Sequence, residues 1–175
     1  MRHAYRPGSL GGLARCCAAA QGHSSTRGSG SGKVDPVREI HRSDYSFITV
    51  DDARGLIRRV RTSVPFPSIA ELRTSSEASL QALATLDRTR YAQLADVRLA
   101  PPRNDPAFEE YVAAYARPLF TGFRRSALLV RTHAGRLQVT RNLGDTGLHE
   151  VQVYMDEALA VGWLLSHSTL PRPLR

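Results

Sequence analysis

Two short segments near residue 50 carry the first regular pattern of apolar and polar positions. Residues 45–50 (YSFITV) combine β-branched and aromatic side chains, and residues 55–62 (GLIRRVRT) alternate less regularly. Patterns of this kind are typical of half-buried strands. Residues 51–54 lie between the two segments and begin with two aspartates, so they predict a turn that joins the strands in a hairpin.

A helical pattern begins after residues 64–67, where two prolines end the second strand. Ser68 and Glu71 have the spacing of a capping box, in which the Ser68 hydroxyl accepts a hydrogen bond from the backbone N–H of residue 71. We therefore predict a helix from Ser68 to about residue 86, with a polar gap at Ser75 and Ser76. Its apolar face consists of Ile69, Leu72, Leu80, Leu83 and Leu86.

The next two elements are a strand over residues 91–99 (YAQLADVRL) and a helix that follows the loop at residues 101–104. Asp105 is a favourable N-cap, and Pro106 suits the first helical position. Apolar residues then recur with the spacing of one helix face, which we interpret as core packed against a sheet. This stripe consists of Phe108, Tyr111, Val112, Tyr115 and Leu119.

Three further segments complete the pattern. Residues 126–130 (SALLV) are continuously apolar, as expected for a strand that is covered on both faces. Residues 135–143 fit two structures, because LQVTR alternates like a strand whereas the segment also suits a crossover helix, which we predict. Residues 150–155 (EVQVYM) alternate strictly and predict the last strand. A closing helix starts at Asp156, and its expected buried residues are Leu159, Trp163 and Leu164.

The predicted order of elements is β-β-α-β-α-β-α-β-α. Alternation of strands and helices favours the α/β class, with a mixed sheet of about five strands and four helices. The later strands are expected to pair in parallel through right-handed crossovers.

Composition divides the chain into one domain and two tails. A length of 175 residues with 42% hydrophobic residues is enough for a single core of ordinary size. Residues 1–36 are basic and rich in glycine and serine, so we expect a disordered tail there. Residues 37–167 form the predicted domain, and residues 168–175 form a flexible C-terminal tail.

The net charge of +8 is unevenly distributed. Half of it lies in residues 1–35, and the remaining part is only mildly cationic, which makes nucleic acid an improbable partner. The two cysteines, Cys16 and Cys17, are adjacent, so they form neither a disulfide framework nor a CxxC metal motif. With no apolar run long enough to span a bilayer, we expect a cytoplasmic protein without a membrane span.

The predicted order, together with several short sequences, resembles the STAS fold (sulphate transporter and anti-sigma factor antagonist), most closely the bacterial SpoIIAA-like branch of small cytoplasmic proteins. The resemblance covers about residues 37–167. The sequences that carry it are Asp96-Val97-Arg98, Arg103-Asn104-Asp105-Pro106-Ala107-Phe108, Leu129-Val130-Arg131-Thr132, Tyr154-Met155-Asp156-Glu157-Ala158 and Gly162-Trp163-Leu164.

The resemblance implies a regulatory role and also shows a departure from the family. Signalling members of the family carry a phosphorylatable serine or threonine after the third strand, at the start of the following helix, where phosphate alters docking to a protein partner. Residues 99–105 of this chain read LAPPRND and contain no hydroxyl side chain. Asp105 could imitate a permanent negative charge, but helix capping explains it more simply.

Two sets of residues are candidates for binding a protein partner or an anionic ligand. In parallel α/β sheets, ligands bind beyond the carboxyl ends of the strands, where helix N-termini offer unpaired N–H groups. Arginines at that edge can hold a carboxylate or phosphate through paired hydrogen bonds, although they can equally be solvated or paired with nearby acids. The first set is Arg98, Arg103, Asn104 and Asp105, and the second is Arg131, Thr132 and His133.

Catalytic and metal motifs are missing from the sequence. There is no Gly-x-Ser-x-Gly turn and no glycine-rich phosphate loop before a helix. The six histidines are scattered without the spacing of metal ligands, so we predict no enzyme, no metal and no cofactor.

Two functional hypotheses follow. In the first, the domain docks a protein through the loop after the third strand and the second helix, with Arg103, Arg124 and Arg125 at the rim. In the second, it carries a small hydrophobic ligand or a lipid in an apolar pocket between sheet and helices. The residues expected to line that pocket are Phe108, Tyr111, Tyr115, Phe120 and Trp163.

Overall fold

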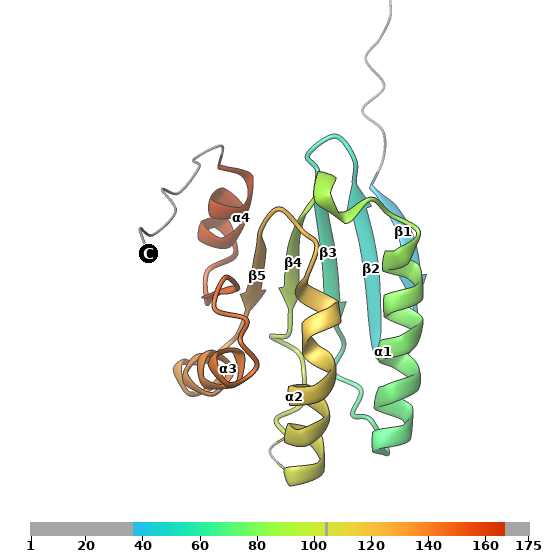
Figure 1. Cartoon of the computed structure of the whole chain (residues 1–175), viewed down its shortest axis with the longest axis vertical. Coiled ribbons are helices and arrows are strands. Elements are labelled where there is room, and N and C mark those ends of the chain that lie inside the picture. Colours follow the sequence, from blue (N-terminus) through green and yellow to red (C-terminus); the bar gives the residue numbers. More distant parts are fainter. Residues whose placement is uncertain (1–36, 104, 167–175) are drawn as a thin grey trace, which may run out of the picture. The chain divides into compact units, whose positions relative to one another are not determined.

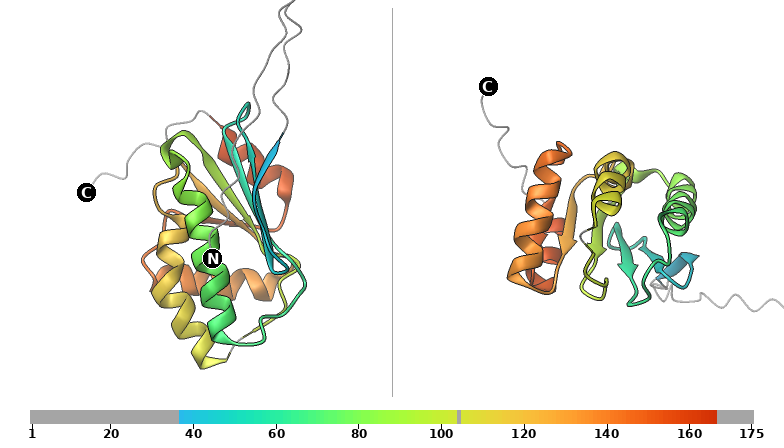
Figure 2. Two further views of the ribbon diagram at one scale, coloured as in Figure 1. Left: turned by 90° about the vertical axis from the view of Figure 1, so that its right-hand side faces the viewer. Right: turned by 90° about the horizontal axis from the view of Figure 1, so that it is seen from below.

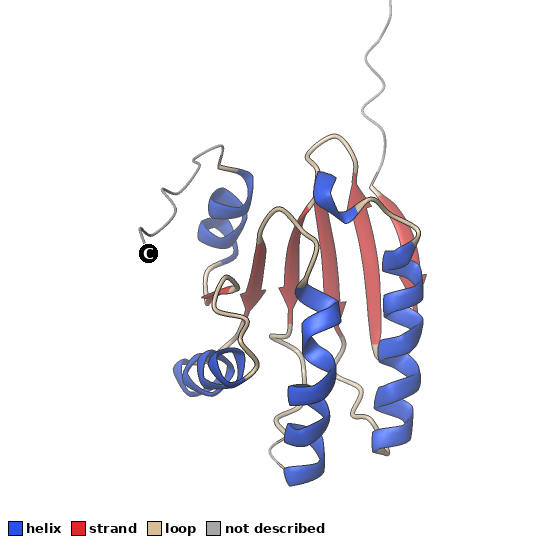
Figure 3. Cartoon of the chain, viewed as in Figure 1, coloured by secondary structure: helices blue, strands red, loops and turns tan. Residues whose placement is uncertain are grey.

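The computed structural model describes residues 37–103 and 105–166, which form a sheet of six strands with four α-helices and one short 3₁₀ helix (Figures 1 and 3). The strands are β1 Arg38–Arg42, β2 Ser46–Asp51, β3 Leu56–Arg61, β4 Ala92–Asp96, β5 Ser126–Leu129 and β6 Gln152–Tyr154. The helices are α1 Ile69–Ala84, η1 Arg88–Arg90, α2 Pro106–Phe120, α3 His133–Asp145 and α4 Glu157–Leu165. The predicted tails, Cys16, Cys17 and the candidate Asn104 lie outside the described residues.

The six strands follow one another in the sheet in the same order as in the chain. β1, β2 and β3 pair antiparallel, whereas β3 to β6 pair in parallel. The α/β class, the hairpin and the helix over residues 135–143 are therefore confirmed. The sequence prediction of about five strands missed β1, because its sequence REIHR has a single apolar residue and lies at an edge of the sheet.

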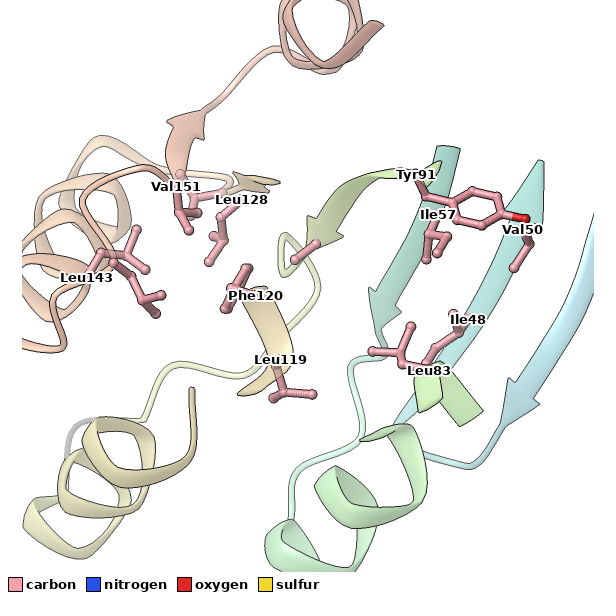
Figure 4. Close-up of a cluster of buried hydrophobic side chains, with 13 residues drawn as sticks. Ile48, Val50, Ile57, Leu83, Tyr91, Leu119, Phe120, Leu128, Leu143 and Val151 are labelled. Atoms are coloured by element: carbon pink, nitrogen blue, oxygen red, sulfur yellow. The ribbon is translucent and has the colours of Figure 1, made fainter. Parts of the chain in front are cut away.

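The consecutive strand order decides which face the three crossover helices, α1, α2 and α3, cover. When every right-handed crossover advances in the same direction, the crossover helices lie on one face of the sheet. Leu83 of α1, Leu119 of α2 and Leu143 of α3 accordingly share one apolar cluster with Ile48 and Ile57. Figure 4 shows this cluster, with Ile48, Ile57 and Leu83 in one group and Leu119, Phe120 and Leu128 in another.

α4 covers the opposite face of the sheet, at β4 to β6 (Figure 2). Its Ala160 and Leu164 pack with Leu94 of β4 and Leu129 of β5. Leu159 was predicted to be buried, which is wrong, because its side chain is 66% exposed. The sequence of α4 is apolar around the whole helix, so periodicity did not show which side faces the sheet.

Each α-helix starts with a side chain that caps its first turn. Ser68 accepts a hydrogen bond from the N–H of Glu71 at 3.2 Å, and Asp105 accepts one from Phe108 at 3.1 Å, as the sequence predicted. Thr132 and Asp156 do the same for α3 and α4. Within the described residues, no helix is long and apolar enough to cross a membrane.

Candidate functional site

The two candidate sets lie at the same end of the parallel strands. β4 ends at Asp96 and β5 ends at Leu129, and these two residues are partners in the parallel ladder. The loops that follow therefore leave the sheet side by side, one leading to α2 and the other to α3. The loops leave from the carboxyl ends of the parallel strands, which is where the sequence predicted the site.

Arg98 is not available to a ligand, because it belongs to an ionic network. Its guanidinium donates to both carboxylate oxygens of Asp96, at 3.0 and 2.6 Å, and to Oε2 of Glu157 at 2.8 Å. Glu157 also accepts a hydrogen bond from Arg58. The network therefore joins β3, β4 and the first turn of α4.

The network also sets the protonation of its acids. Burial raises the pKa of Asp96, but hydrogen bonds from Arg98 outweigh this and bring the pKa below its ordinary value. The hydrogen bond from Arg58 is the main cause that lowers the pKa of Glu157. Sequence reasoning missed Arg58 and Glu157, since 99 positions separate them and no local pattern links them.

Arg103 and Asp105 form a local ion pair at the start of α2. The Arg103 Nε donates to Asp105 Oδ2, and the Arg103 guanidinium lies over the Phe108 ring, 5.4 Å from its centroid. This hydrogen bond is the main cause that lowers the pKa of Asp105. Asp105 thus combines a cap and an ion pair, and Arg103 covers an aromatic side chain of α2.

The second set surrounds the start of α3. Thr132 is the N-cap of this helix, and its hydroxyl accepts a hydrogen bond from Gly135 N–H at 3.1 Å. Arg131 and His133 are exposed, and neither forms an ion pair within residues 37–103 and 105–166. These two side chains remain open to a partner.

The rim arginines of the docking hypothesis lie at opposite ends of the parallel strands. Arg103 follows β4, whereas Arg124 and Arg125 precede β5 and therefore lie at the amino end of the parallel strands. The Arg124 side chain reaches the carbonyl of Gly55 at 3.3 Å, and Arg125 bonds the carbonyl of Trp163. One docking surface does not include all three.

The five residues of the expected apolar pocket do not come together either. Tyr111 and Tyr115 stack on α2 with 4.7 Å between ring centroids, and Phe120 belongs to the core beneath α1, α2 and α3. Trp163 lies on the other face of the sheet, where its ring is 6.1 Å from that of Tyr154. Phe108, at the start of α2, lies under Arg103. The crossing of α4 to the far face separates Trp163 from the rest.

A surface that the sequence analysis did not single out runs along α3. A hollow of about 660 Å³ follows one side of this helix, where Leu137 is 75% exposed and no atom comes within 4 Å of the position of a Cβ on Gly144. Its lining residues are His133, Arg136, Leu137, Thr140, Arg141, Gly144 and Asp145. These positions share a helix face, so the pattern was present in the sequence but hidden by the alternation of LQVTR.

A second groove lies between α2 and α3, next to the first. It has a volume of about 290 Å³ and shares Arg141 and Asp145 with the hollow along α3. An ion pair between Arg141 and Glu109, at 3.8 Å, crosses it. We refer to the two together, lined by α2 and α3, as the α2–α3 surface. The other residues that line the second groove are Glu110, Val112, Ala113, Asn142 and Thr146.

Known chemistry and known proteins add no further assignment. Among the described residues, no group of three or more histidine, cysteine, aspartate or glutamate side chains is arranged to hold a metal ion. Comparison of the chain with protein-family models, with curated proteins and with solved structures gives no match.

Proposed function

We propose that this chain is a non-enzymatic binding module of the STAS (SpoIIAA-like) kind, which docks a protein partner through the α2–α3 surface. The observation that carries the proposal is the pair of neighbouring grooves along α2 and α3, with Leu137 exposed between charged side chains. The order of elements from β2 to α4 is the order on which the resemblance rests.

The side chains around Leu137 indicate the chemistry of the partner. Arg136 and Arg141 flank it, and Arg131 and His133 lie at the start of the same helix. An exposed leucine flanked by two arginines suits an amphipathic helix that offers one apolar side chain and, to those arginines, carboxylates. We therefore propose an acidic, amphipathic segment of another protein as the occupant.

The docking surface would work without the phosphorylation switch of the signalling relatives. The segment between β4 and α2, residues 97–105, has no serine or threonine. Asp105 supplies a fixed negative charge at the start of α2, and Arg103 already partly neutralises it.

The test compares two exposed leucines on opposite faces of the sheet. Leu137→Glu with Arg141→Glu should abolish capture of the partner, whereas Leu159→Glu on α4 should leave capture unchanged. Both sites are exposed, so both proteins should fold, and circular dichroism would check this. The captured protein is then purified and titrated against each variant, and its binding should weaken as salt rises. Equal binding to the α3 variant and the wild type would refute the proposal.

A further inference from the structure

Arg59 is a cation that the structure leaves without a counter-charge. It lies on β3 and, by its register with Ile48 of β2, faces α1, α2 and α3. Its Nε atom is buried and has no hydrogen-bond partner among the described residues, while the residue as a whole keeps some exposure. Burial lowers the pKa of Arg59 to about 10, so the side chain still carries its charge at neutral pH.

The guanidinium of Arg59 reaches from β3 to the end of α2. The side chain starts two residues after Ile57 of the apolar core, and its guanidinium lies 5.2 Å from the centre of the Phe120 ring. A cation–π contact of this kind supplies attraction but accepts no hydrogen bond from the guanidinium edge. The buried Nε–H group therefore remains to be satisfied.

Gln93 is a second unsatisfied group on the same face of the sheet. Its partner in the ladder is Ile57, two residues before Arg59, so Gln93 and Arg59 are diagonal neighbours on adjacent strands. The side chain is 0% exposed, and neither its amide oxygen nor its amide nitrogen has a hydrogen-bond partner. Buried amides in native proteins almost always have one.

Phe120 connects the two groups in space. Ser126, the partner of Gln93 on β5, donates a hydrogen bond to the Phe120 carbonyl at 3.1 Å, and Arg59 lies over the Phe120 ring. Arg59 and the ladder partner of Gln93 therefore both contact one residue at the end of α2. The Arg59 Nε–H and the Gln93 N–H₂ are two buried donors without an acceptor, and an anion is the ligand that accepts from both.

We propose that Arg59 and Gln93 form an internal site for a small anion, which places a carboxylate or phosphate oxygen between the Arg59 guanidinium and the Gln93 amide. The ligand supplies the negative charge that Arg59 lacks, and the Gln93 N–H₂ donates a second hydrogen bond. This site lies under α2 on β3 and β4, and it is independent of the α2–α3 surface.

The experiment titrates the full chain with sodium acetate and, separately, with sodium phosphate, at constant ionic strength set by sodium chloride. Two readouts are used: the melting temperature and the NMR resonance of the Arg59 Nε–Hε group. At least one anion should raise the melting temperature in a saturable manner and shift that resonance. The anion that does so identifies the ligand as a carboxylate or a phosphate.

Variants separate this site from general anion effects. Arg59→Met should abolish the saturable effect, and Gln93→Leu should weaken the affinity about tenfold through loss of one hydrogen bond to a charged group. Arg59→Lys keeps the charge, should fold, and should bind more weakly because it lacks the Nε–H. Arg90→Met removes an exposed arginine as a control and should bind like the wild type.

Two results would overturn the proposal. One is the absence of any saturable shift of the Arg59 resonance with both anions. The other is equal stabilisation of the wild type and Arg59→Met, which would mean that the anions act on the protein surface in general. Neither result would affect the docking test, because that test depends on Leu137 and Arg141.

Discussion

Arg98 and Glu157 lie 59 positions apart in the chain, yet the Arg98 guanidinium donates to the Glu157 carboxylate at 2.8 Å. The bond joins the loop after β4 to the first turn of α4. Because Arg98 also holds Asp96, and Glu157 also holds Arg58, four charges of alternating sign fix α4 on its face of the sheet. An arginine that the sequence suggested for ligand binding is thus used to position a helix.

This network predicts a loss of stability in acid. The pKa values of Asp96 and Glu157 are below their ordinary values of 3.8 and 4.5, so the folded protein binds fewer protons than the unfolded chain. Their contribution is complete above those ordinary values and is lost as pH falls through the lowered pKa values. Urea unfolding between about pH 6 and about pH 3 should show a declining free energy of unfolding.

Glu157→Gln isolates the part of this decline that comes from the network. The variant should lose about 1 kcal/mol near neutral pH, a modest value because the Glu157 side chain is partly exposed. Its stability should also fall less steeply in acid than that of the wild type. An identical pH dependence in both proteins would contradict the assignment of the network to this effect.

The Arg88 side chain links the ends of α1 and α2, and we expect this link to stabilise the fold. Its guanidinium donates to the carbonyl of Pro118 at 2.8 Å and, at longer distances, to those of Thr121 and Leu83. Carbonyls at helix C-termini need such donors. Arg88→Met should lower the free energy of unfolding by about 1–2 kcal/mol. Arg54→Met, at an exposed arginine of the β2–β3 turn, is the control and should change stability less.

We expect the Thr132 cap to stabilise the start of α3. Its hydroxyl caps the helix through Gly135 N–H, so Thr132→Ala should cost about 1 kcal/mol, whereas Thr132→Ser should be nearly neutral. Hydrogen exchange would locate the effect, because amide protons in the first turn of α3 should exchange faster in the alanine variant. Equal protection in both variants would show that the cap does not hold this turn.

We expect glycine-to-alanine substitutions at two positions to have opposite effects on stability. Gly55 has a φ of +60°, and a Cβ there would lie 3.2 Å from the Arg90 carbonyl oxygen, so Gly55→Ala should destabilise by about 1 kcal/mol or more. Gly162 lies inside α4, with nothing within 4 Å of its Cβ position. Gly162→Ala should therefore stabilise by about 0.5–1 kcal/mol. Thermal unfolding of both variants would check the contrast.

Local patterns determined most of the elements of this protein. Alternation over residues 45–62, the caps at Ser68 and Asp105, and the apolar stripe of α2 predicted structure correctly, because each depends on neighbours within a few residues. The same reasoning failed for β1, whose charged sequence becomes a strand only because β2 offers it an edge. An edge strand is decided by pairing rather than by its own residues.

The sequence determined where the candidate residues lie, but it did not determine what each of them does. Strand ends and helix starts placed Arg98, Arg103, Thr132 and His133 at the carboxyl edge of the sheet, since parallel α/β order requires this. Only the tertiary structure showed that Glu157 takes up Arg98 and that Leu137 faces outward.

Pairing across the fold also decided which buried groups remain unsatisfied. The sequence determined that Arg59 and Gln93 lie on strands, but their common face and missing partners depend on the register of β3 with β4. The packing of α4 on the other face likewise placed Trp163 on the far side of the sheet from Phe120. The physical reason is that hydrogen bonds and ion pairs between distant residues have no periodic trace in the chain, whereas caps, turns and helix faces do.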